Sequence, residues 1–152
     1  MKVSDILVRD ASLLELEATD KDQVLQEMAT ALGAAEASVQ ADGLLTVLRD
    51  REELQSTGIG DGVAIPHGKL PGLDRLMACF ARSSGVDFAA IDGQPTKLFF
   101  LLVVPEQSGG QHLKALARIS RFLRDESFRD KLIAAVSLDE VFAAIDEEDA
   151  KF

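Results

Sequence analysis

The feature that most restricts how this chain can fold is an unbroken apolar run, Leu98 to Val104. A strand with one face in water alternates apolar and polar residues, whereas a continuous run indicates burial on both faces. We therefore expect Lys97 to Val104 to form the central strand of a sheet that helices cover on both sides. Pro105 has no backbone N–H to donate and is expected to end this strand. A transmembrane helix needs about 20 apolar residues, so no membrane insertion is predicted.

Apolar residues at helical spacing predict three long helices. The first follows a cap at Thr19 and is expected to end at Gly33, because glycine is common just after the last helical turn. The second is expected from Ser38 to Leu54, and the third from His112 to Arg124. The expected inward stripe of the third helix consists of Leu113, Leu116, Ala117, Ser120 and Leu123.

Two shorter helices are predicted near the C-terminus. Ser127 is expected to cap one of them, and Ser137 and Glu140 have the spacing of a capping box at the start of the other. The acidic tail from Asp146 to Asp149 is expected to fray. In the first of these helices, the residues expected to face inward are Phe128, Leu132 and Ile133.

Shorter extended segments complete a predicted sheet of about five strands. Leu14 to Glu17 alternates like a half-buried edge strand, Val63 to Ile65 is short and apolar, and residues 75–82 and Val86 to Ala90 are also predicted to be extended. Helices that alternate with strands predict an α/β protein, with one mixed sheet and helices on both faces. No repeat or linker divides the chain, so residues 1–152 are expected to form a single domain with a core of about residues 4–146.

Charge and cysteine content narrow the function classes. The formal net charge of −10 opposes binding to nucleic acid and suits a partner with a basic docking surface, although ordinary solubility explains it equally well. The single cysteine, Cys79, excludes an intrachain disulfide and lies in an apolar run, where a buried structural thiol is expected. No apolar signal segment follows Met1. Together these observations predict a cytoplasmic protein.

A glycine-rich segment, residues 56–69, carries one of the two histidines. Val63 to Ile65 is expected to be a strand that Pro66 ends, which would place His67 in a loop at the strand's end. A neutral imidazole there is a usable nucleophile near pH 7, because its reference pKa is about 6.5. Backbone N–H groups of the preceding turn would suit an anion with several oxygens. The residues expected to form this phosphate loop are Ser56, Thr57, Gly58 and Gly60.

These residues belong to a longer pattern in which the chain resembles a known family. The pattern comprises Arg51 and Glu52, Ser56 to Gly60, Gly62 to Lys69, Phe88 to Pro95, Leu98 to Pro105, and His112-Leu113. In it the chain resembles the fructose/mannitol-type (type-2) enzyme IIA proteins of the bacterial sugar phosphotransferase system, and it is most similar to their free-standing nitrogen-regulatory member. The resemblance covers nearly the whole chain and implies a three-layer α/β fold.

The resemblance implies roles for three side chains. His67 matches the phosphorylated residue, and His112 matches the second active-site histidine, which on chemical grounds would donate a hydrogen bond to a phosphate oxygen. The alternative for His112 is a helix-start histidine that only bonds a backbone carbonyl. Arg51 matches a motif arginine and would bind phosphate through two parallel hydrogen bonds. The alternative for Arg51 is a solvated charge paired with Glu52 or Glu53.

The resemblance also implies the partners. The phosphoryl donor would be a small histidine-containing phosphocarrier protein. In the regulatory alternative, the phosphorylation state of this chain controls target proteins such as potassium transport or sensor systems. In the transport alternative, the chain is a sugar-specific enzyme IIA that passes phosphate to the IIB domain of a membrane permease. A binding module that has lost phosphoryl transfer is a third class, and the presence of both His67 and His112 argues against it.

No cofactor is expected, because the phosphoryl group would arrive on another protein and no Walker A pattern is present. Zinc is the alternative ligand, with His67, His112 and Asp61 as candidate ligating residues, but no closely spaced pair of ligands accompanies His67. A Ser–His–Asp hydrolase is excluded by the lack of a G-x-S-x-G elbow.

Overall fold

A five-stranded mixed sheet is the middle layer of the computed structural model, which describes residues 1–152. The strands are β1 (Gly58–Gly60), β2 (Val63–Ala64), β3 (His67–Leu70), β4 (Met77–Val86) and β5 (Thr96–Pro105). β2 and β3 pair in parallel with β5, β4 pairs with it in an antiparallel manner, and β1 pairs with β2 at the edge. The prediction of an α/β fold around one central strand is therefore confirmed.

The apolar run in β5 feeds two separate hydrophobic cores, one on each face of the sheet. Leu98, Phe100, Leu102 and Val104 belong to one cluster of 21 buried residues, and Phe99, Leu101 and Val103 belong to another cluster of 21. Because successive side chains of a strand point to opposite faces, a strand without polar positions holds both cores together.

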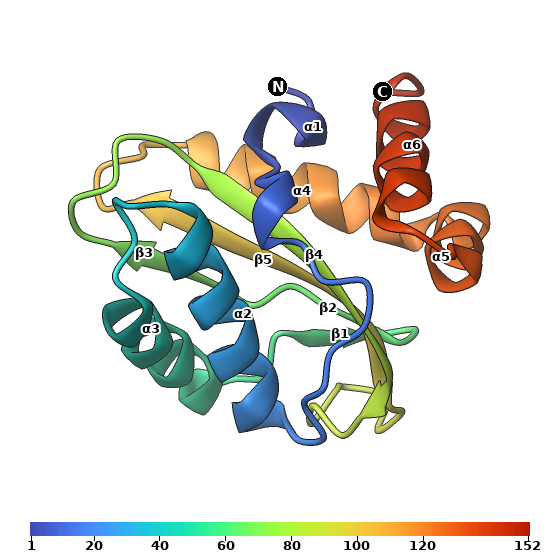
Figure 1. Ribbon diagram of the computed structural model, residues 1–152, viewed down its shortest axis with the longest axis horizontal. Coiled ribbons are helices and arrows are strands. Elements are labelled where there is room, and N and C mark those ends of the chain that lie inside the picture. The colour runs from blue at the N-terminus through green and yellow to red at the C-terminus, as the bar shows by residue number, and fades with distance from the viewer.

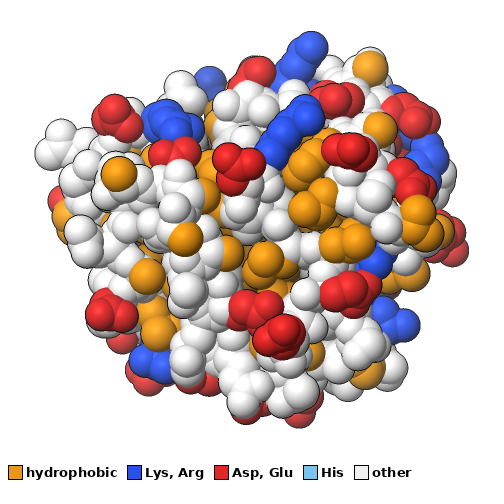
Figure 2. Space-filling model, in the orientation of Figure 1, with side chains coloured by type: hydrophobic (Ala, Val, Ile, Leu, Met, Phe, Trp, Pro, Cys, Tyr) orange, Lys and Arg blue, Asp and Glu red, His pale blue; other side chains and the backbone are white.

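Helices cover each face, as Figure 1 shows. One face is covered by α2 (Lys21–Ala35) and α3 (Ala41–Leu54). The other is covered by α1 (Val3–Ile6), α4 (Gln111–Arg124), α5 (Glu126–Ala134) and α6 (Leu138–Asp149), and a 3-10 turn, η1 (Arg9–Ala11), follows α1. On the face of the molecule seen in Figure 2, acidic and basic side chains are interspersed.

The first two long helices differ from the prediction in where they begin and end. Asp20, and not Thr19, caps α2, since its carboxylate accepts a hydrogen bond from the Gln23 N–H at 2.8 Å. The predicted end at Gly33 is wrong, because α2 continues to Ala35. A Cβ on Gly33 would lie 3.0 Å from the Cβ of Ala41, so this glycine permits the close approach of α2 and α3. α3 begins at Ala41, three residues after the predicted start at Ser38.

Two predicted strands are wrong, and two others take their place. Leu14 to Glu17 forms no ladder: Leu13 makes one isolated bridge to Ala81, and the Leu16 N–H donates to the Arg82 carbonyl at 2.7 Å. Val86 ends β4, and residues 87–90 are not in a strand. The sheet has five strands because β1 and β3 are also part of it. Both contain glycine, and their sequences are typical of loops.

The inward stripe of α4 is also rotated from the predicted one. Its buried residues are Ala115, Ile119, Phe122 and Leu123, whereas Leu113 and Ala117 are exposed. In α5, Asp125 is the cap in place of Ser127, and Ile133 is exposed. The exposed Leu113 lines a pocket that also contains His67 and His112.

The acidic tail does not fray. α6 continues to Asp149, whose side chain is buried and accepts hydrogen bonds from the backbone N–H groups of Val3 at 2.8 Å and Ser4 at 3.0 Å. Arg118 lies 3.1 Å from the same carboxylate and pairs with it. The C-terminal helix thus caps the first helix and anchors it to α4.

Candidate active site

His67 is the first residue of β3 and not, as predicted, a loop residue. Pro66 lacks an N–H, but its carbonyl accepts a hydrogen bond from the Leu102 N–H at 2.9 Å. Pairing with β5 therefore continues past the proline, and His67 lies opposite Leu102 in the parallel ladder. The histidine consequently stands on the central sheet and not on a flexible connection.

The ring of His67 is fixed by its own backbone environment. Nδ1 lies 2.8 Å from the carbonyl oxygen of Ile65, and because a carbonyl can only accept, Nδ1 carries the hydrogen. Burial lowers the pKa of His67 below its ordinary value, while the hydrogen bond to Ile65 opposes this shift and the charge of Arg51 reinforces it. The ring is therefore neutral near pH 7, with Nε2 as its unprotonated nitrogen.

A pocket of about 480 Å³ brings the predicted site residues together. His67, His112 and Arg51 all line it, as does Lys69. The sheet and the exposed ends of α3 and α4 supply the walls. The remaining lining residues are Val47, Asp50, Leu54, Gly68, Leu102, Val104, Leu113 and Leu116.

His112 is the second residue of α4, and its environment is more open than that of His67. Nδ1 lies 3.1 Å from the Gly109 carbonyl and 3.2 Å from the hydroxyl of Ser108. The alternative interpretation, a histidine bonded to a backbone carbonyl, is therefore true of one nitrogen. The same ring lines the pocket, so the carbonyl bond orients it and leaves Nε2 available.

Arg51 is not held by an acidic partner. Its guanidinium donates to the Gln55 carbonyl at 2.9 Å, and none of the ion pairs of the structure includes Arg51. Glu52, the neighbour proposed as its alternative partner, pairs instead with Lys21 at 2.8 Å. The charge of Arg51 is thus free to act on an anion in the pocket.

The predicted phosphate loop does not line this pocket. The Ser56 hydroxyl donates to the Phe88 carbonyl at 2.7 Å, and the Thr57 N–H and hydroxyl both donate to the carboxylate of Glu52. Gly58 and Gly60 begin and end β1. These polar groups hold the fold together, and their contact with phosphate stays a prediction.

Gly68 is part of the motif around His67, and the structure gives a steric reason for a glycine at this position. A Cβ at Gly68 would overlap the Cγ1 of Val47, so β3 and α3 touch directly beside His67. The two exposed leucines of the rim were missed as well: Leu54 is 83% and Leu113 62% exposed. A large apolar side chain left in water beside a polar site is the signal that reveals them.

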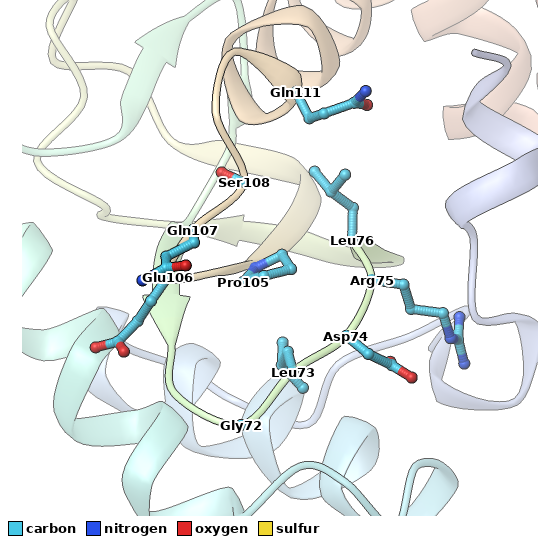
Figure 3. A pocket seen from close by; sticks show the side chains of 10 residues that line it. All are labelled: Gly72, Leu73, Asp74, Arg75, Leu76, Pro105, Glu106, Gln107, Ser108 and Gln111. Atoms are coloured by element: carbon cyan, nitrogen blue, oxygen red, sulfur yellow. The ribbon is translucent and has the colours of Figure 1, made fainter.

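A second pocket, of about 530 Å³, is bordered by the loop that connects β5 to α4 (Figure 3). It is formed by the loops after β3 and β5 and contains no histidine. Its charged residues do not converge: Arg75 pairs with Glu36 at 2.7 Å, and Asp74 and Glu106 stand apart from each other in Figure 3. This pocket holds no histidine and no converging set of charged groups, so it is not the candidate site.

Other chemical candidates are accounted for by the fold. Cys79 is buried in β4, and burial raises the pKa of its thiol to about 12, as expected for a structural cysteine. Asp61, the third candidate metal ligand, donates its N–H to Asp92 at 3.1 Å in the turn between β1 and β2. No three His, Cys, Asp or Glu residues are grouped to hold a metal ion. None of the helices has the length and apolar character needed to cross a membrane.

Comparison with known proteins gives matches over nearly the whole chain. The family described as "Phosphoenolpyruvate-dependent sugar phosphotransferase system, EIIA 2" matches residues 5–148. A nitrogen regulatory protein of Bradyrhizobium diazoefficiens is 44% identical over 147 residues, which cover 95% of each chain. The crystal structure of nitrogen regulatory protein IIA-Ntr from Neisseria meningitidis has a TM-score of 0.88 and 35% identity, and covers 94% of this chain and 98% of that one. The fructose-specific EIIABC component of Bacillus subtilis is 35% identical over 150 residues, 98% of this chain but 24% of that protein.

Proposed function

Since this chain belongs to the EIIA 2 family of the phosphoenolpyruvate-dependent sugar phosphotransferase system, as its sequence motifs predicted, we propose that it accepts and passes on a phosphoryl group at His67. One observation carries the proposal. The neutral, oriented ring of His67 shares a pocket with His112 and with two cations, Arg51 and Lys69, that have no acidic partner.

Nε2 of His67 is the attacking atom in this proposal, because Nδ1 is occupied by its hydrogen bond to Ile65. As the new bond from Nε2 to phosphorus forms, the bond between phosphorus and the donor's phosphohistidine nitrogen breaks. The donor nitrogen keeps the electron pair of the broken bond and leaves as a neutral imidazole. Nδ1 keeps its proton throughout, so no proton has to leave His67 during transfer.

Catalysis then consists of positioning and of stabilising charge on the three equatorial oxygens of the moving group. Arg51 and Lys69 supply positive charge from two walls of the pocket. His112 donates from Nε2 to a phosphate oxygen when its ring is protonated at both nitrogens. Its bond to the Gly109 carbonyl keeps that nitrogen directed to the pocket.

The donor is a histidine-containing phosphocarrier protein, and the shape of the site favours a protein over a small molecule. Leu54 and Leu113 line the pocket with exposed side chains, which the surface of a protein partner would bury. Burial of such residues at an interface is worth about 25 cal/mol per Å² of apolar area before the costs of association.

For the destination of the phosphate we favour the nitrogen-regulatory branch over the sugar-specific one. The supporting observation is that a nitrogen regulatory protein matches with 44% identity over 95% of its own length. The fructose-specific relative is less similar, at 35%, and this chain spans about a quarter of it, so transfer to a permease IIB domain is the second candidate. We further propose that residues 1–152 act as one domain in the cytoplasm.

The proposal is tested by incubating the protein with a phosphorylated phosphocarrier protein and measuring intact mass. One acid-labile phosphate should appear on the wild type and none on His67→Ala. Persistent labelling of that variant would refute the assignment. Adding a fructose-type IIB domain to the phosphorylated protein distinguishes the branches, because only a sugar-specific enzyme IIA should pass its phosphate on at a useful rate.

A further inference from the structure

A buried carboxylate next to the pocket is unused by the mechanism above. Glu52 lies in the last turn of α3, directly after Arg51, and its side chain is 5% exposed. One oxygen accepts the Thr57 N–H at 3.0 Å and lies 2.8 Å from the ammonium of Lys21, and the other accepts the Thr57 hydroxyl. A carboxylate withdrawn from water is costly unless it is paired in this way.

The bonds continue from Thr57 to the reacting histidine. The Thr57 carbonyl accepts the Ile65 N–H at 3.1 Å, and the Ile65 carbonyl accepts Nδ1–H of His67 at 2.8 Å. Glu52, Thr57, Ile65 and His67 are therefore linked end to end, although neither Glu52 nor Thr57 lines the pocket.

Lys21, which pairs with Glu52 at the start of this series of hydrogen bonds, is also held in place. The ammonium of Lys21, at the start of α2, also lies 4.8 Å from the ring centre of Phe88, which is fully buried. Ser56, beside Thr57, donates to the carbonyl of the same Phe88. Glu52 thus joins α2, α3 and the segment before β1 at one buried point.

We propose that Glu52 is a positioning residue for phosphoryl transfer, which holds the ring of His67 through Thr57 and Ile65 so that Nδ1 stays protonated and Nε2 faces the donor. The inference rests on the proposed function of His67. It also assigns the N–H and hydroxyl of Thr57 a task in orientation, in place of direct contact with phosphate.

The charge of Glu52 acts on His67 in the same direction as the hydrogen bond between Nδ1 and the Ile65 carbonyl, because both raise the pKa of His67. Its carboxylate raises the pKa of His67 against the larger, opposite effect of burial. Removing the charge should lower that pKa further, so a titration of His67 reports on Glu52 independently of the transfer rate.

The test is Glu52→Gln, which keeps the shape of the side chain but not its charge, with Glu53→Gln as the matched control on the exposed side of the same turn. With a phosphorylated phosphocarrier protein as donor, Glu52→Gln should lower the maximal rate roughly tenfold to hundredfold, as expected for a misplaced reacting atom, and leave the KM for the donor unchanged. Nitrogen NMR of the His67 ring should show a growing population protonated at Nε2. Glu53→Gln should match the wild type in both measurements.

A second pair of variants covers the case in which Glu52→Gln does not fold. Thr57→Val keeps the N–H bond and the side-chain shape but removes the hydroxyl. It should therefore slow phosphoryl transfer and raise the population of His67 protonated at Nε2. Thr57→Ser, which keeps a hydroxyl, should restore the transfer rate and the ring spectrum. Wild-type rate together with an unchanged ring spectrum in Glu52→Gln, or in Thr57→Val, would overturn the inference. A wild type that accepts no phosphate would instead refute the proposed function, while the ring spectrum would still test the positioning role.

Discussion

The two histidines of the pocket are held in opposite ways. His67 stands on a strand of the central sheet, and its ring is bonded to a carbonyl whose own residue, Ile65, is buried. His112 begins a helix after a loop of exposed glycines, and its ring bonds only to groups of that loop, Gly109 and Ser108. The strand that carries His67 is held by its pairing with β5, whereas the support of His112 is a few residues of local chain.

This difference suits two different tasks. A nucleophile has to meet phosphorus along one line, so it benefits from a rigid support. A hydrogen-bond donor has to follow oxygens that move as the phosphoryl group changes hands, so it benefits from a support that can adjust. We therefore expect changes near His67 to affect both fold and rate, and changes near His112 to affect mainly the rate.

The largest expected effect is that of His112→Ala on transfer. Loss of one hydrogen bond to a charged group costs about 1.5–3 kcal/mol, which corresponds to roughly a 10- to 150-fold slower reaction. The melting temperature should stay within a few degrees of the wild type, because the ring is bonded only to its own loop. Rapid-quench kinetics with a phosphorylated donor, together with thermal unfolding, measure both quantities. A folded variant with the wild-type rate would show that His112 has no part in transfer.

A pair of glycine variants compares the two supports directly. Gly68→Ala places a Cβ against Val47, and forcing a methyl group into such a contact costs typically about 1–3 kcal/mol. Gly110→Ala, in the loop before α4, meets no atom within 4 Å and has a φ of −85°, which alanine adopts freely. Urea unfolding should therefore show a clear loss of stability for the first variant and almost none for the second. Equal stabilities would mean that β3 and α3 are not tightly packed beside His67.

The smallest expected effect is a pH dependence that comes from His67. Burial lowers the pKa of His67 in the folded protein, so the unfolded chain, with a pKa of about 6.5, binds the proton more readily. The resulting stability is present in full above pH 6.5 and is lost as the pH falls from there through the folded pKa. Substituting glutamine, His67→Gln, should flatten this part of the curve of unfolding free energy against pH. A variant curve with the same slope as the wild type between pH 7 and 5 would contradict this assignment.

The sequence predicted best what depends on continuous patterns. The apolar run at Leu98 to Val104 was sufficient to place the central strand, and its lack of polar positions was sufficient to require two covered faces. The motif around His67 led to the family, and the resemblance implied that His112 belongs to the same active site; both side chains line one pocket.

What the sequence did not show depends on partners far away along the chain. Pro66 looked like the end of a strand, but the pairing that continues beyond it is made with β5. The apolar residues of α4 allow more than one inward stripe, and only packing against the sheet chose Ala115 and Ile119 over Leu113. The roles of Glu52 and Asp149 follow from hydrogen bonds that no local sequence pattern predicts.

The bond between Asp149 and the first helix has a consequence for the order in which the protein can assemble. It joins Val3 to a residue 146 positions later, so it cannot form until Asp149 has left the ribosome. At about 5–20 residues per second, synthesis of the residues from Val3 to Asp149 takes roughly 7 to 30 s. The core that contains α2 and α3 uses residues only up to Val103, whereas the other core needs Ile145. The growing chain can thus bury one face of the sheet while the other face is still exposed to solvent. A chain truncated before α6 would leave the apolar side of α4 accessible to chaperones and proteases.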